Sequence, residues 1–320
     1  MGRDPASARD AAKAALTIAE LGLRFLHEYV PVHCKPSTAY EYRRAVELLI
    51  NPVLGKTKIP DLVRADVSRF HHAFRNTPYQ ANRALGVLSK MMNMAEVWGL
   101  RLDGSNPCRH IKKYKEKKRK RYLNYDELER LGRVLEQIEA DGSVFPPAVA
   151  AIRLLIFTGA RLSEILHLRW EDVDLQNGLL VLPDSKTGAK QIFLNDAATL
   201  LLKGIPRVEG NPHVIQGAKA GNCLVNLQKP WRKVRAQANL PDVRINDLRH
   251  SFASMAIGNG LPLPIIGGLL GHTQPSTTAR YAHLADDPLR AAASLVGGKL
   301  TTALNGEYQN EKEQPAPKGP

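Results

Sequence analysis

Five short segments of the chain carry residue types that together suit an anionic substrate. The segments are Thr158–Glu164, Ser185–Gly188, Asn246–His250, Leu270–His272 and Thr278–Leu284. Each alone has an ordinary structural explanation, because a buried arginine usually forms an ion pair, a hairpin lysine is usually solvated and a helical tyrosine usually belongs to the core. Their joint occurrence is specific: Lys186 lies between two distant arginines, Arg161 and Arg249, and His272 closely precedes Tyr281.

A phosphodiester is the anion that these side chains fit best. It carries one negative charge and gains more during nucleophilic attack, and two guanidiniums can hold its non-bridging oxygens through charge-assisted, forked hydrogen bonds. Arg161 is expected near a helix start, where the helix dipole also favours an anion. The two arginines would do the work that other nucleases assign to metal ions. We expect no metal site and no cofactor, because Asp172 and Asp174 fit a turn and His71 and His72 fit a helix surface.

The five segments resemble the active site of the tyrosine recombinases, the family of phage integrases and chromosome-dimer resolvases. The resemblance runs from about residue 18 to 297. It implies a helical core-binding domain and a catalytic domain that together clamp double-stranded DNA, as in the DNA integration of mobile elements. The catalytic residues that it implies are Arg161, Lys186, Arg249, His272 and Tyr281.

The resemblance also implies a role for each of these side chains. The phenol of Tyr281, with an ordinary pKa of about 10, becomes a nucleophile when it is deprotonated or placed among cations. Its attack would give a 3′-phosphotyrosine and a free 5′-hydroxyl, and would conserve the bond energy, so rejoining needs no ATP. Lys186 is suited to protonating the departing 5′-oxygen, and His272 to donating a hydrogen bond to the phosphate.

One position departs from the family pattern. The family usually has histidine three residues before the second arginine, and this chain has Asn246 there. An amide can hydrogen-bond a phosphate but cannot accept a proton near neutral pH, so the role of Asn246 stays open and water or the cationic pocket would have to suffice. We expect His250, one residue from Arg249 on a helix, to point elsewhere and pack. Structural roles are also expected for Glu164, which would orient its helix, and for Arg280 and His283.

Hydrophobic periodicity predicts the elements that carry these residues. In the first part it predicts helices over about 16–29, 38–49, 65–74 and 79–98, with breaks at Pro31 and Pro36 and a turn at Asn51-Pro52. In the second part it predicts helices over about 124–135, 147–157 and 161–168, strands over 179–182 and 191–194, and helices from Ile245 onward. The fold class is therefore mainly α: a helical core-binding domain and a mostly α catalytic domain with a small antiparallel β-sheet.

A basic run separates the two predicted domains. Nine of the residues from 109 to 121 are Lys or Arg, so the run should repel itself and be extended. It is either a strap across DNA phosphates or a solvated linker. The expected domains are a flexible segment 1–17, a core-type DNA-binding domain 18–108, the linker 109–121, a catalytic domain 122–297 and a disordered tail 298–320. The linker residues proposed to bind DNA are Lys112, Lys113, Lys117, Lys118, Arg119, Lys120 and Arg121.

Composition supports an anionic partner and an intracellular setting. The 45 Lys and Arg residues exceed the 31 Asp and Glu residues, for a net charge of +14, and nucleic acid is the commonest anionic partner. Three dispersed cysteines, no long apolar run and no secretion signal favour a cytoplasmic, nucleoid-associated protein with no membrane partner.

Several functional readings stay open at this stage. The resemblance implies a tetramer on two paired DNA sites, strand exchange through a Holliday junction and, for some members, an accessory DNA-bending factor. A type IB topoisomerase shares the chemistry, and a catalytically weak DNA-binding relative is a third reading. The target site, the direction of the reaction and an N-terminal arm-binding domain cannot be read from the sequence.

Overall fold

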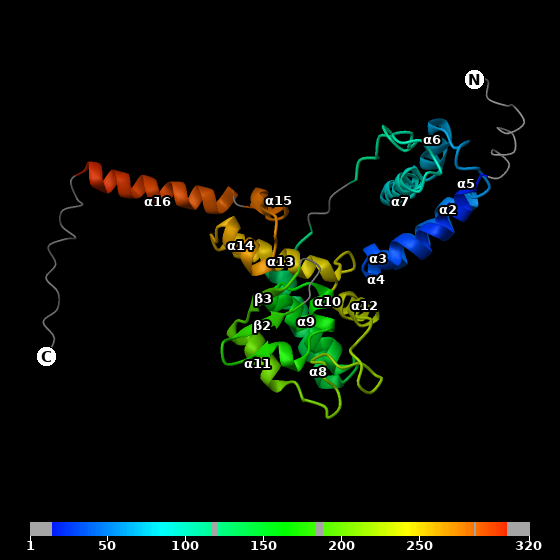
Figure 1. Cartoon of the computed structure of the whole chain (residues 1–320). Helices are drawn as coiled ribbons and strands as arrows, with labels where there is room; N and C mark the ends of the chain where they lie inside the picture. Colours follow the sequence, from blue (N-terminus) through cyan, green and yellow to red (C-terminus); the bar gives the residue numbers. More distant parts are fainter. Residues whose placement is uncertain (1–14, 117–120, 184–187, 285, 306–320) are drawn as a thin grey trace, which may run out of the picture. The chain divides into compact units, whose positions relative to one another are not determined.

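A computed structural model of the chain describes residues 15–116, 121–183, 188–284 and 286–305, with the main chain alone over 283–292. The chain divides into two compact units at residues 119 and 120. Both units are largely helical, and the second contains a small antiparallel sheet (Figure 1). The predicted fold class, mainly α with a small sheet in the catalytic part, is confirmed. No helix of the described residues is long and apolar enough to cross a membrane.

The first unit is a helical bundle around one apolar core. Thr17 caps α2, the first helix of the described residues, because its side chain accepts a hydrogen bond from the N–H of Glu20 while the Glu20 carboxylate accepts one from the Thr17 N–H. Phe25, Phe70 and Met91 are completely or almost completely buried in the core. Its elements are α2 (Ile18–Arg24), η1 (Phe25–Tyr29), α3 (Val30–His33), α4 (Pro36–Ala45), η2 (Val46–Ile50), α5 (Asn51–Leu54), α6 (Arg64–Ala73) and α7 (Pro78–Val97).

Two prolines that were predicted to end helices lie within helical segments instead. The prediction of a break at Pro31 and of a turn at Asn51-Pro52 is wrong, because the chain stays helical to His33 and to Leu54. A wide π-type turn precedes each proline, η1 before Pro31 and η2 before Pro52. Each proline is then near the start of a new α-helical turn, where its missing N–H costs no hydrogen bond.

The second unit packs its helices around the largely buried helix α9 and beside a three-stranded sheet. Strand β1 pairs with β2 and β2 with β3, all antiparallel. The two predicted strands are present, whereas β1 was not predicted and contains Asp174. The elements are α8 (Tyr125–Asp141), α9 (Pro146–Thr158), α10 (Leu162–Leu166), η3 (Trp170–Asp172), β1 (Val173–Asp174), β2 (Leu179–Leu182), β3 (Lys190–Phe193), α11 (Asp196–Gly204), α12 (Gln228–Gln237), α13 (Ile245–Gly258), α14 (Leu263–Leu270), α15 (Pro275–Thr278), η4 (Ala279–Leu284) and α16 (Asp286–Leu304).

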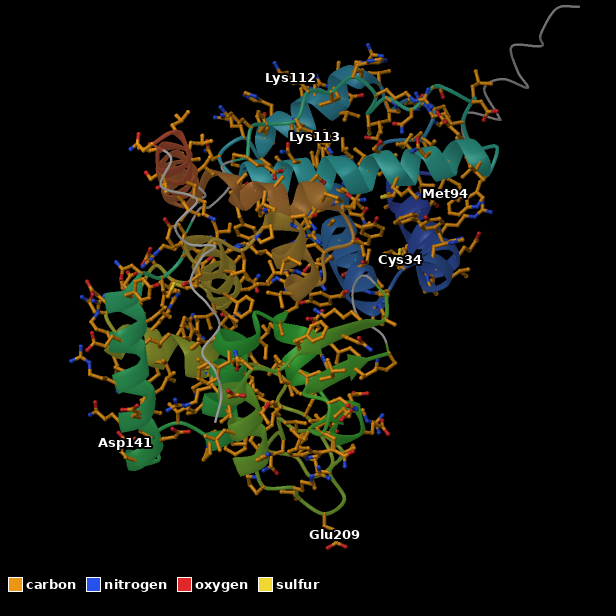
Figure 2. The ribbon with its side chains drawn as sticks, turned by 90° about the vertical axis from the view of Figure 1, so that its left-hand side faces the viewer. Cys34, Met94, Lys112, Lys113, Asp141 and Glu209 are labelled. Atoms are coloured by element: carbon orange, nitrogen blue, oxygen red, sulfur yellow. The ribbon has the colours of Figure 1, made fainter. Side chains whose placement is uncertain are left out.

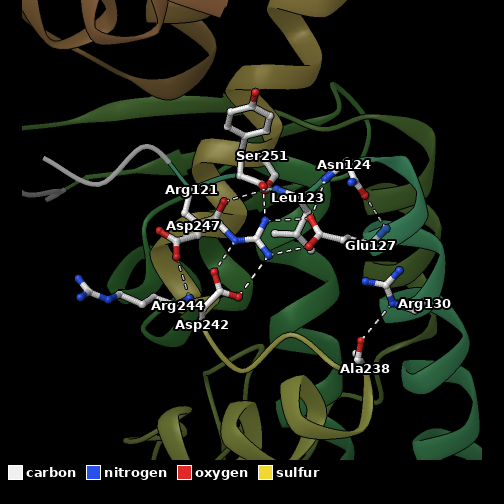
Figure 3. A network of polar contacts seen from close by, with 11 residues as sticks. Arg121, Leu123, Asn124, Glu127, Arg130, Ala238, Asp242, Arg244, Asp247 and Ser251 are labelled. Carbon is white, nitrogen blue, oxygen red and sulfur yellow. Dashed lines mark hydrogen bonds and ion pairs between the residues drawn. The ribbon is translucent and has the colours of Figure 1, made fainter.

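A polar network anchors the start of the second unit to α13 and to the loop before it (Figure 3). The guanidinium of Arg121 donates to both oxygens of Glu127 at 2.6 and 2.8 Å and to Asp242 at 2.8 Å. The main-chain N–H of Leu123 donates to the hydroxyl of Ser251 on α13 at 2.8 Å. These bonds fix the first residues of the unit against the helix that carries Arg249.

The last described helix is longer than the sequence predicted. The tail was expected to be disordered from residue 298, but α16 is helical to Leu304. The residues Lys299, Leu300, Ala303 and Leu304 are good helix formers, and they continue a helix that had already begun before Gly297 and Gly298. Residues 306–320 lie outside the described part.

Candidate active site

Arg161 lies where α9 ends and α10 begins. Gly159 ends α9 with a φ of +60°, and a side chain there would meet the ring of Phe252, so glycine is required. The chain then turns, and Arg161 is the residue just before the first turn of α10. Its main-chain N–H and its guanidinium both donate to the carboxylate of Glu164, each at 2.8 Å. The guanidinium is thereby held at the helix start, as predicted.

Glu164 is a buried carboxylate held between two cations. Lys190, the first residue of β3, places its Nζ 2.7 Å from Oε2 of Glu164, and Arg161 contacts Oε1. Burial raises the pKa of the Glu164 carboxyl, but the hydrogen bonds and charges of Lys190 and Arg161 outweigh this and lower it to about 2. Glu164 is therefore ionised and orients both cations. The expectation that Glu164 has an orienting role agrees with this geometry.

Arg249 is held by main-chain carbonyls at two helix ends. Its guanidinium donates to the carbonyl of Gly159, after α9, and to that of Leu270, the last residue of α14, both at 2.7 Å. Burial, and next the charge of Arg161, lowers the pKa of Arg249 to about 10, so the guanidinium still carries its charge at neutral pH. Arg161 also reaches the carbonyl of Gly271, at 3.4 Å. The two arginines therefore meet at the C-terminal end of α14.

His272 follows Gly271 and is oriented by a buried threonine. Its Nδ1 lies 2.8 Å from the hydroxyl of Thr278, which is almost completely buried. Burial, and then the charges of Arg249 and Arg161, lowers the pKa of His272 to about 4, so the imidazole is neutral at pH 7. When the threonine hydroxyl donates to Nδ1, the proton stands on Nε2, which can then donate to a phosphate oxygen.

Tyr281 contacts a histidine that the sequence did not place in the site. The Nδ1 of His250, on α13, lies 2.6 Å from the Tyr281 hydroxyl in η4. The prediction that His250 points away from the site is therefore wrong. Its neighbour Arg249 points toward the carbonyls at the ends of α9 and α14, while His250 points toward η4. These three helix segments lie together in one cluster. Burial raises the pKa of Tyr281, and the nearby Arg249 and Arg280 partly offset the increase.

The remaining predicted residues have different positions. Asn246 is exposed on the first turn of α13. Lys186 lies outside the described residues, as do Lys117, Lys118, Arg119 and Lys120. Lys112 and Lys113 are exposed (Figure 2), whereas Arg121 is held by the carboxylates of Glu127 and Asp242.

The structure thus brings Arg161, Arg249, His272 and Tyr281 into one cluster. Sequence reasoning missed Lys190 and the contact of His250. Lys190 could have been found from the strand pattern, since it starts the second strand of a hairpin already chosen for Lys186. Within the described residues, no three His, Cys, Asp or Glu side chains gather in a way that could hold a metal ion.

Comparison with known families decides where the chain belongs. The profile of the phage integrase family matches residues 121–287, just over half of the chain, and that of the phage integrase N-terminal SAM-like domain matches residues 17–74. The chain belongs to the phage integrase family of tyrosine recombinases. The resemblance drawn from the five segments is confirmed.

Relatives and solved structures agree with this assignment. Tyrosine recombinase XerA of Saccharolobus solfataricus is 34% identical over 144 residues, which make up 43% of this chain and 46% of the relative. The chain spans about half the length of the curated relatives that it matches first. The fold is similar to that of a lambda integrase dimer bound to a COC′ core site, with a TM-score of 0.69 at 18% identity over 90% of this chain and 82% of that one. It is also similar to that of a lambda integrase tetramer bound to a Holliday junction, with a TM-score of 0.67 at 17% identity over 86% and 82%.

Proposed function

We propose that this chain is a site-specific DNA recombinase that cleaves a DNA strand with Tyr281 and rejoins it through a 3′-phosphotyrosine. The observation that carries the proposal is the cluster at the end of α14. There Arg161 and Arg249 are held by main-chain carbonyls and by Glu164. His272 and Tyr281 lie close enough to Arg249 for its positive charge to lower the pKa of each. Two fixed guanidiniums beside a phenol suit in-line attack on a phosphodiester.

Each side chain of the cluster has a physical task in this reaction. The two guanidiniums bind the non-bridging oxygens and stabilise the charge that develops on them. Neutral His272 donates a hydrogen bond from its Nε2–H to one of these oxygens. Lys186, from the hairpin, protonates the 5′-oxygen as it departs. Tyr281 then leaves when the 5′-hydroxyl of a new partner strand attacks the phosphotyrosine.

Assembly and partners belong to the same proposal. Two paired duplex sites would hold four copies of the chain, and strands would be exchanged through a Holliday junction, with an accessory DNA-bending factor in some settings. Support comes from the described part of α16, where Leu295, Val296, Leu300 and Leu304 are each more than half exposed. Such apolar side chains on a terminal helix suit docking onto a neighbouring copy. The lambda integrase tetramer on a Holliday junction is similar in fold.

The test uses DNA chosen by the protein itself. A Tyr281→Phe variant selects duplexes from a random-sequence pool, because it lacks one oxygen and keeps every charge. The selected duplex is then nicked beside the cleavage position, so that the short product diffuses away and the covalent complex accumulates. The unchanged chain should give a covalent band on a denaturing gel, and Tyr281→Phe should bind equally well and give none. A covalent band of normal intensity in Tyr281→Phe would end the assignment of Tyr281.

A type IB topoisomerase-like activity is the second candidate, favoured by the same cluster of residues. It predicts relaxation of supercoiled plasmid whether or not the selected site is present, and without recombinant products. A recombinase should need two copies of the site and should yield recombinants.

A further inference from the structure

The hydroxyl of Tyr281 has a direct hydrogen-bond partner on α13. The Nδ1 of His250 lies 2.6 Å from it, and the two ring centroids are 5.6 Å apart with the rings inclined at 57°. Tyr281 is almost completely buried and His250 is partly buried. A short contact between an imidazole nitrogen and a phenol is the geometry of proton transfer.

The surroundings of His250 keep its imidazole neutral. Burial lowers the pKa of His250 and the charges of Arg280 and Arg249 lower it further, while Asp247 acts in the opposite direction. A neutral imidazole protonated at Nε2 has a free lone pair at Nδ1, and this lone pair faces the phenol. Asn246, at the position where the family usually has histidine, is exposed, and its amide can accept a hydrogen bond but is too weakly basic to accept a proton.

We propose that His250 is the proton acceptor for Tyr281, a role that rests on the proposed cleavage reaction. In cleavage, the phenol proton moves to Nδ1 as the phenolic oxygen bonds to phosphorus, and the bond to the 5′-oxygen breaks and that oxygen takes a proton from the general acid. In rejoining, the 5′-hydroxyl attacks phosphorus and gives its proton back to the deprotonated general acid, while the bond to the phenolic oxygen breaks and the imidazolium of His250 returns its proton to that oxygen. His250 is thus restored in each cycle, and protons and charges balance.

The experiment compares two substitutions that separate proton transfer from positioning. His250→Asn places an amide near the position of Nδ1 and can still hydrogen-bond the phenol, but cannot take its proton. His250→Phe keeps a ring and removes both functions. Single-turnover cleavage of the nicked, selected duplex should fall about 10²- to 10³-fold in both variants, with DNA binding unchanged. His167→Asn is the matched control, because His167 is exposed at the end of α10, and should cleave normally.

A more acidic phenol at position 281 distinguishes proton transfer from positioning. It should raise the cleavage rate of His250→Asn only if the histidine normally accepts the phenol proton. Incorporation at position 281 of a tyrosine whose ring carries several fluorines should restore most of the loss in His250→Asn, because that phenol is far more acidic and loses its proton without a strong acceptor. In the parent chain the rate should fall on the acid side as His250 is protonated, below its ordinary pKa of about 6.5. This acid limb should be absent from the residual activity of His250→Asn.

The outcomes separate the proton acceptor from the reaction on which it rests. Near-normal cleavage by His250→Asn, or a loss that fluorotyrosine does not relieve, would refute the proton-acceptor role and leave the recombinase proposal standing. Absence of any covalent complex with the unchanged chain would instead overturn the proposed function and the role of His250 with it.

Discussion

The Nζ of Lys190 lies 2.7 Å from Oε2 of Glu164, and both side chains are more than nine-tenths buried. The same carboxylate accepts hydrogen bonds from the main chain and the guanidinium of Arg161. One buried negative charge therefore holds two of the cations that surround the candidate phosphate site. Without it, Arg161, Lys190 and Arg249 would repel one another before DNA arrives, since the charges of both arginines act on Lys190.

Replacement of Glu164 should therefore destabilise the second unit. Glu164→Gln keeps the volume but leaves Lys190 and Arg161 without their shared anion, and breaking a buried ion pair in this way costs about 3 kcal/mol. The free energy of unfolding in urea would measure the loss. The matched control is Glu139→Gln, because Glu139 pairs with Arg153 at 2.7 Å but is 44% exposed, so its loss should cost less than about 1 kcal/mol. Equal costs for both variants would contradict the central role of Glu164.

His272 should make the folded protein sensitive to mild acid. Its pKa is lowered to about 4 in the folded chain, against an ordinary value of about 6.5. Between these values the unfolded chain binds a proton that the folded chain does not, so the free energy of unfolding falls as pH drops from about 6.5 to 4. His272→Gln should flatten this decline, measured in urea at pH 7 and pH 5, whereas His167→Gln, at an exposed position, should not. The low pKa of Glu164 adds its own loss only below about pH 4.5.

The residues of the site could be predicted to different degrees. Arg161, Arg249, His272 and Tyr281 were found because their types and order are specific, and Gly159 and Gly271 mark the helix ends that position them. Both glycines have positive φ, and a side chain at Gly271 would meet Lys190.

The contact of His250 could not be read from helical spacing. Neighbouring residues on a helix point in different directions, and Arg249 and His250 do so. The conclusion that His250 lies outside the site was nevertheless wrong, because the two elements that these side chains face, the end of α14 and the helix η4, belong to the same site. Only the tertiary path of residues 271–281 brings these neighbours together. In the first unit, the helical turns at Pro31 and Pro52 were missed for a similar reason, since proline rules describe regular α-helices and not a π-type turn.

The basic linker should bind DNA through counterion release. Replacing Lys117, Lys118, Arg119 and Lys120 with Gln should weaken binding to all sequences alike and flatten the salt dependence by up to about 0.9 per lost phosphate contact. Fluorescence anisotropy at several salt concentrations would measure both. The control replaces Lys203 and Lys219, exposed lysines of the second unit, with Gln. If the linker variant keeps the affinity and slope of the parent, the run is only a solvated connection.

Helix α16 should contribute to assembly more than to binding. Deletion of residues 288–320 removes Leu295, Val296, Leu300 and Leu304, whose side chains are exposed. Binding to one site, measured by gel shift, should change little, and the joining of two sites into one complex should be strongly reduced. Deletion of residues 306–320 alone keeps the whole helix and should leave synapsis intact. Normal recombination by the larger deletion would remove this role of α16.

Lys186 and Lys190 are the two candidates for the general acid that protonates the leaving group. Lys186, in the hairpin, is the residue implied by the family resemblance, and Lys190 lies in the cluster but is bound to Glu164. An alkoxide is a poor leaving group, so loss of the general acid should slow cleavage about 10²- to 10⁴-fold. A thiolate leaves without a proton, because a thiol is several pKa units more acidic than an alcohol. A substrate with sulfur in place of the bridging 5′-oxygen should therefore restore cleavage by Lys186→Ala. The sulfur substrate should restore cleavage by Lys190→Ala much less, because that variant disturbs Glu164 and Arg161 and does not remove the general acid. It should not restore cleavage by Tyr281→Phe, which has no nucleophile. Selective rescue of Lys190→Ala would transfer the acid role to Lys190, and equal sulfur effects in the parent chain and in Lys186→Ala would refute the assignment of Lys186.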